Sequence, residues 1–161
     1  MSEKEMFIQT WEREFQTTFK VLKAYPADKL DMKPHELSRS AKDLAWTFVS
    51  EENVVDGICK GQIDYQNMPK APGRFDEIVA TFEKKHKENV AKVKNLPEQD
   101  LNTSLLFPVA PKQMGQVRRG DLLWMMVMDM VHHRGQFSVY LRLVGAKVPS
   151  IYGPTADEPW M

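Results

Sequence analysis

The sequence lacks features that mark several large classes of protein. It has a single cysteine, Cys59, among 161 residues, so neither an intramolecular disulfide nor a CxxC metal site can form. Lys and Arg together number 22, as do Asp and Glu, and the formal net charge is zero. Because phosphate-binding surfaces carry a basic excess, we expect neither nucleic acid nor a membrane as a partner.

Long apolar runs and familiar catalytic motifs are also absent. No run comes close to the roughly 18 uncharged apolar residues of a membrane-spanning helix. The opening segment, MSEKEMFIQTWEREF, carries acidic residues throughout and has no signal-peptide core, which favours a cytoplasmic protein. The GxSxG, GxGxxG, Walker-type and HExxH patterns do not occur.

Helical periodicity, in contrast, covers most of the chain. Ser2 and Glu5 form a capping-box pattern at the first helix, and Gly61 is a typical helix stop. Apolar residues recurring at steps of three and four predict helices over residues 3–24, 42–60, 75–96 and 121–144. No segment shows a convincing strand alternation. The fourth helix is the most apolar, as expected for one packed by several neighbours.

The connectors between these helices are long. Residues 25–39, 61–73 and 97–118 each exceed the short loops of a simple up-down bundle. Such connectors can span the length of a helix, so parallel and antiparallel neighbours both remain open. We predict an all-α fold, a single four-helix bundle that forms one domain over residues 1–161.

The fourth predicted helix carries an acid and two adjacent histidines in MDMVHHRGQF. On a helical wheel, His133 shares its face with Asp129, four residues earlier, and with Tyr140. His132 falls about 100° away from His133. We therefore interpret His133 as the inward histidine and His132 as a boundary or surface residue.

Polar residues on an inward helix face need partners, because an unpaired buried charge is expensive. Asp129 and His133 can satisfy each other, or both can point at a metal or reactant between helices. Glu51 lies centrally on the apolar stripe of the second helix, with Thr47 one turn earlier. Two carboxylates and a histidine converging in a bundle resemble ligand sets for divalent metals. Both interpretations stay open at this point.

Two further side chains are weaker candidates. His86 lies on the apolar stripe of the third helix, where a lone histidine is more often a core residue with one hydrogen bond. It ranks as an outer contributor to a site. Tyr140 can line the pocket and donate its hydroxyl, although packing is its more common use.

Three segments, HHRGQFSVYLRLVGAKVPSIYGPTADEP, SRSAKDLAWTFVSEE and AYPADKLDMKP, together resemble the DinB-like superfamily. This is a set of four-helix-bundle proteins grouped with YfiT-type metal-dependent hydrolases, and the resemblance covers nearly the whole chain. It implies a bundle with an up-down-down-up helix order that is commonly a homodimer.

The resemblance also implies a metal site. In typical members one histidine from the second helix and two from the fourth, at i and i+4, bind a divalent metal. Carried over, the last position is His133, but the other two hold Asp129 and Thr47. Glu51, one turn from Thr47, can take the third place. Zn, Ni, Mn and Fe are candidates, and an Asp/His/Glu set favours harder, more octahedral metals than three histidines.

Two functions follow from this resemblance. The first is a metal-dependent hydrolase or thiol-linked transferase acting on a small molecule, in which the metal lowers the pKa of a water or thiol. His133 and Asp129 are then ligands, Glu51 a third ligand or general base, and Tyr140 part of the pocket wall. The second is a non-catalytic, metal-free dimeric bundle that binds a small molecule or acts in stress response. DNA binding conflicts with the zero net charge.

Overall fold

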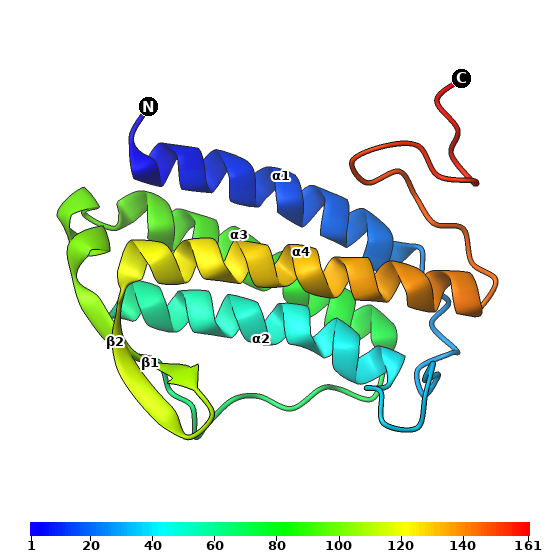
Figure 1. Ribbon diagram of the computed structural model, residues 1–161, viewed down its shortest axis with the longest axis horizontal. Helices are drawn as coiled ribbons and strands as arrows, with labels where there is room; N and C mark the ends of the chain where they lie inside the picture. The colour runs from blue at the N-terminus through cyan, green and yellow to red at the C-terminus, as the bar shows by residue number, and fades with distance from the viewer.

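Four long helices and one small hairpin make up the computed structural model, which describes residues 1–161 (Figure 1). The elements in chain order are α1 (Glu3–Lys23), α2 (Ala41–Lys60), α3 (Phe75–Asn95), the 3₁₀ helix η1 (Glu98–Asn102), β1 (Ser104–Ala110), β2 (Gln113–Arg118) and α4 (Arg119–Leu143). The four predicted helices are confirmed, with their ends displaced by no more than two residues.

The sequence signals for helix ends act as anticipated. The Ser2 hydroxyl accepts from the Glu5 backbone N–H, and the Glu5 carboxylate accepts from the Ser2 backbone N–H, which completes a capping box. Gly61 ends α2 in the left-handed conformation, at φ 83°. A side chain is strained at that angle, so glycine suits the position.

The helix directions place α2 beside α4. Figure 1 shows α1 and α4 running one way and α2 and α3 the other, the order that the family resemblance implies. Both α1 and α2 pack against α3 and α4. The apolar core is shared by all four helices. Side chains from α2 and α4 can therefore meet inside the bundle.

The expectation that the chain has no strands was wrong. Within the segment assigned to a connector, β1 and β2 pair antiparallel, with Leu105 opposite Val117 and Phe107 opposite Gly115. Leu105, Leu106 and Phe107 are consecutive apolar residues, so β1 shows no alternation in the sequence even though Leu106 is exposed. The all-α prediction holds for the bundle and fails for this hairpin.

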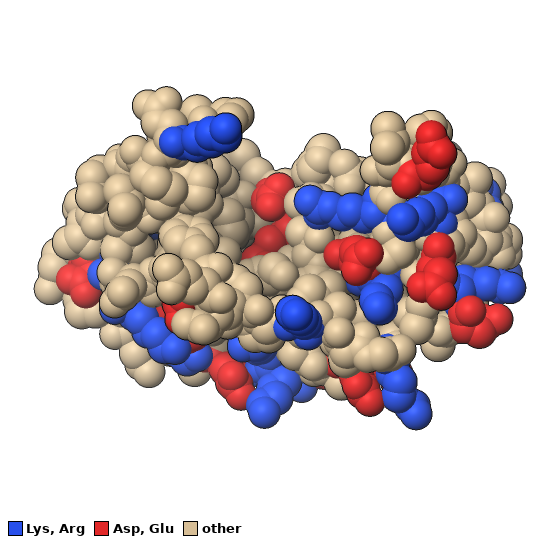
Figure 2. Space-filling model, turned by 90° about the horizontal axis from the view of Figure 1, so that it is seen from below, with Lys and Arg blue, Asp and Glu red and all other residues tan.

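Charge of both signs is mixed on the face shown in Figure 2, where acidic atoms also lie in a central hollow. Basic side chains form no continuous patch on this face. None of the helices combines the length and the apolar character needed to cross a membrane.

The most deeply buried ion pair joins α1 to α4. Arg134 and Glu14 have side chains only 1% and 4% exposed, and Arg134 Nη2 lies 2.8 Å from Glu14 Oε2. Tyr152, in the segment after α4, accepts a hydrogen bond from Arg134 and donates one to Glu14, each 2.6 Å long. This network fastens the C-terminal segment to the bundle.

Candidate metal centre

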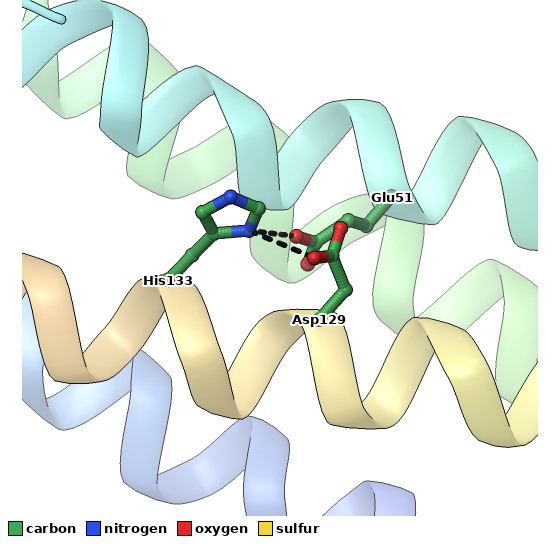
Figure 3. Close-up of side chains that lie close together, drawn as sticks. All are labelled: Glu51, Asp129 and His133. Carbon is green, nitrogen blue, oxygen red and sulfur yellow. Dashed lines mark hydrogen bonds and ion pairs between the residues drawn. The ribbon is translucent and has the colours of Figure 1, made fainter. Parts of the chain in front are cut away.

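Glu51 of α2 meets Asp129 and His133 of α4 in the interior of the bundle (Figure 3). His133 Nδ1 lies 2.8 Å from Glu51 Oε1 and 3.6 Å from Asp129 Oδ1. One ligand atom from each residue can be chosen so that all three lie within 4.8 Å of one another. The structure thus brings together three of the four residues named from the sequence as metal ligands.

The cluster is closed on one side and open on the other. The side chains of Glu51 and His133 are 7% and 12% exposed, whereas that of Asp129 is 43% exposed. Phe48, one turn before Glu51, presents its ring edge-on to the imidazole and helps to exclude water. Asp129 therefore lies at the mouth of the cluster, with Glu51 deeper inside.

Burial governs the protonation of the cluster. It raises the pKa of Glu51 well above the ordinary value, and the negative charge of Asp129 raises it further. Burial also lowers the pKa of His133, although the Asp129 carboxylate opposes that effect. Without a cation, both groups favour their neutral forms.

One oxygen of Glu51 is left without a partner. Oε2 is buried and makes no hydrogen bond, and the only other such side-chain atom in the protein is Asn53 Nδ2. A buried polar atom without a partner costs about 1–3 kcal/mol, so natural folds keep few of them. A bound ion is one of the partners that can satisfy such an atom.

The donor set fits a divalent metal. Two ligand atoms bound to one ion at about 2.1 Å lie no more than about 4.2 Å apart, so the observed spacing needs only a small adjustment. Two carboxylates match the charge of a divalent cation, and a cation beside Oε2 would satisfy that orphaned atom. Oxygen-rich sets of this kind suit harder metals such as Mn²⁺ and Fe²⁺.

Thr47 lies outside the cluster of Glu51, Asp129 and His133. Its hydroxyl accepts a 2.8 Å hydrogen bond from Arg39 Nη1 and donates to the Asp43 carbonyl. The position that the family resemblance pointed to as a helix-2 ligand therefore holds a side chain engaged with the preceding connector.

The remaining histidines also lie apart from the cluster. His86 is buried, with Nδ1 at 2.9 Å from Glu52 Oε1, and its ring stacks on Phe15. His86 is a core residue with one hydrogen bond, the more common role of a lone histidine on such a stripe, and it contributes nothing to the cluster. His132 is exposed, as anticipated, and contacts Gln136.

A pocket of about 540 Å³ adjoins the cluster and shares His133 with it. Its polar and apolar walls include Ser38, Arg39, Leu44, His132, Gln136 and Tyr140. The Tyr140 hydroxyl donates to the Arg39 backbone carbonyl at 2.8 Å, which ties the connector before α2 to α4. Burial raises the pKa of Tyr140, so its hydroxyl stays protonated at neutral pH. The structure places Tyr140 in the pocket wall.

Two residues near the cluster were not identified from the sequence. Glu52 follows Glu51 but points toward α3, where its carboxylate accepts from Asn89 and contacts His86. Adjacent glutamates in an apolar helix could have signalled this, because consecutive residues occupy different faces. Arg39 carries no such signal, since it lies in a connector without periodicity.

The fold and the candidate site together define a four-helix-bundle protein with a cluster of candidate metal ligands between its second and fourth helices. The chain belongs to the DinB family, whose family model matches residues 1–160. An uncharacterised protein of Bacillus subtilis, YrdA, is 26% identical over 156 residues, which cover 94% of this chain and 89% of YrdA.

Solved structures support the same fold. A DinB-like protein from Bacillus cereus superposes with a TM-score of 0.77 at 22% identity, covering 92% of this chain and 97% of its own. The DinB-like protein YjoA from B. subtilis has a TM-score of 0.74 at 21% identity, covering 91% and 97%.

Proposed function

We propose that this protein holds one divalent metal ion with Glu51, Asp129 and His133 and acts on a small molecule bound in the adjacent pocket. The observation that carries the proposal is the buried, unpartnered Oε2 of Glu51 in a cluster whose other donors are a carboxylate and an imidazole. The reaction class is that of a metal-dependent hydrolase or thiol-linked transferase.

The roles of the residues follow from their positions. Glu51 and Asp129 supply charge and His133 supplies Nδ1, while its second ring nitrogen points away from both carboxylates (Figure 3). A bound divalent ion supplies Lewis-acid chemistry, because it polarises a substrate oxygen and lowers the pKa of a coordinated water or thiol. Tyr140 and Leu44 form pocket wall, and the half-exposed Asp129 leaves the cluster accessible.

Added metal should stabilise the metal-stripped protein. A ligand at 100 times its Kd contributes about 2.7 kcal/mol, which for a chain of this size raises Tm by about 5–10 °C. We expect that shift with Mn²⁺ or Zn²⁺, measured by thermal unfolding. Glu51→Gln and His133→Gln should abolish it, because each removes a ligand and leaves a buried group in place.

The control for this experiment is Glu88→Gln on α3, which removes an exposed acidic charge that is not among the donors of the cluster. It should retain the full shift. An equal shift in wild type, Glu51→Gln and His133→Gln would show that metal binds elsewhere, and no shift in wild type would support the metal-free alternative.

A further inference from the structure

The pocket beside the cluster is chemically suited to an anion. None of the nine residues that line it is acidic, and they include Arg39 together with His132 and Gln136. This contrasts with the neighbouring cluster, in which two of three side chains are carboxylates. A small molecule spanning both would meet a cationic region and a metal-binding region side by side.

Part of the Arg39 guanidinium has hydrogen-bond donors that no group of the protein uses. Only Nη1 donates to a protein side chain, the Thr47 hydroxyl at 2.8 Å, and no carboxylate lies within ion-pair distance of the guanidinium. Its Nε and Nη2 edge is uncommitted. Elsewhere in the protein, Arg74 uses that same edge to hold the Asp76 carboxylate with two hydrogen bonds of 3.0 and 2.6 Å.

The position of Arg39 is fixed at two points. Its backbone carbonyl accepts the Tyr140 hydroxyl from α4, and its side chain donates to Thr47 on α2. The positive charge of Arg39 also acts on the cluster. Burial raises the pKa of Glu51, and the charge of Arg39 opposes that rise. A guanidinium positioned in this way is preorganised for a planar oxyanion.

We propose that Arg39 binds the carboxylate of a small organic acid whose other end reaches the Glu51–Asp129–His133 cluster. This inference depends on the proposed function in one respect: the other end of the acid meets a metal only if the cluster holds one. The three apolar residues in the pocket leave room for a short carbon skeleton between the two ends. Thr47, which accepts the hydrogen bond from Arg39 Nη1, serves to orient the guanidinium.

Succinate is a suitable probe, because it carries two carboxylates on a short chain, and succinamide is its neutral counterpart. The ¹⁵N-labelled full chain is titrated with each, first metal-free and then with Zn²⁺, while amide shifts are followed. We expect saturable shifts around Ser38, His132 and Gln136 with succinate and none with succinamide. Arg39→Gln should weaken succinate about tenfold or more, as expected for loss of charge-assisted hydrogen bonds.

The matched control is Lys33→Gln, which removes the same charge from the same connector at an exposed residue outside the pocket. It should leave the affinity unchanged. Equal succinate affinity in wild type and Arg39→Gln, or no saturable shift in either metal state, would overturn the inference. Failure of the metal proposal has a different signature, namely no effect of Zn²⁺ while Arg39-dependent binding of succinate persists.

Discussion

Replacing Arg134 by methionine should lower the free energy of unfolding by about 3–5 kcal/mol, because it leaves the buried Glu14 carboxylate without its cation. Wild-type Arg134 donates to Glu14 Oε2 at 2.8 Å and to the Glu14 carbonyl at 3.1 Å. It also supports Tyr152, which lies over the guanidinium and contacts both partners. Urea unfolding measures the loss directly.

Arg142→Met is the matched control for this prediction. Arg142 lies on the same helix and pairs with Asp157 at 2.7 Å, but its side chain is half exposed. Exposed pairs of this kind contribute about 0–1 kcal/mol, so the same substitution should have little effect. If the two variants lost equal stability, burial of the Arg134 pair would not be the cause.

The Arg134 effect should shrink in acid. Burial alone would raise the pKa of Glu14, but hydrogen bonds from Tyr152 and Arg134 outweigh it and hold that pKa below its ordinary value of 4.5. A depressed carboxyl pKa stabilises the fold above pH 4.5, and this contribution disappears as the pH falls through the folded-state pKa. In Arg134→Met, protonation removes the charge of the unpaired Glu14 carboxylate and with it the cost of burying that charge. The stability gap between the two proteins therefore narrows below pH 4.5.

Truncating Glu52 and truncating its neighbour Glu51 on α2 should have opposite consequences for stability and for metal affinity. Glu52 is 1% exposed and fully engaged, because Asn89 donates to its carboxylate and carbonyl and His86 Nδ1 lies at 2.9 Å. Glu52→Ala leaves His86 buried without its partner and Asn89 with only its bond to the backbone carbonyl, at a cost of about 2–4 kcal/mol. Metal affinity, measured by calorimetry on whatever fraction stays folded, should persist.

Glu51→Ala in the metal-free protein should change the free energy of unfolding by less than about 1 kcal/mol. The variant loses the His133 contact but also removes a buried carboxyl with one unpartnered oxygen. Its metal affinity should be lost. A large destabilisation by Glu51→Ala together with unaltered metal affinity would assign Glu51 to the core and not to a site.

The helices could be predicted closely because their signals are local. The capping box at Ser2 and the stop at Gly61 depend on residues within one turn, and the apolar stripes report burial directly. The hairpin could not be predicted in this way. Its strand β1 is apolar on both faces, so the period of two that identifies a half-buried strand is missing.

Part of the candidate site could be predicted from the sequence for the same reason. His133, Asp129 and Glu51 stand on inward helix faces, where a polar side chain is conspicuous, and the structure brings these three together. The direction of Thr47 toward Arg39 depends on the path of the preceding connector, which carries no periodic pattern.

The Arg134–Glu14 pair could not be predicted from the sequence, for a different reason. Arg134 falls about 100° from His133 on a helical wheel, and α4 is enclosed by neighbours on more than one side. Which helix packs against each face of α4 depends on the tertiary arrangement and not on the local sequence. The sequence therefore gives no signal that Arg134 is buried or that Glu14 is its partner.

The most direct test of the metal site is the metal content of the native protein, purified without an affinity tag and analysed by mass spectrometry of the elements. We expect about one divalent ion per chain in wild type and nearly none in His133→Ala, since the imidazole is the only nitrogen ligand of the set. Wild-type protein with no bound metal, or His133→Ala with the same content as wild type, would contradict the assignment of Glu51, Asp129 and His133 as a metal centre.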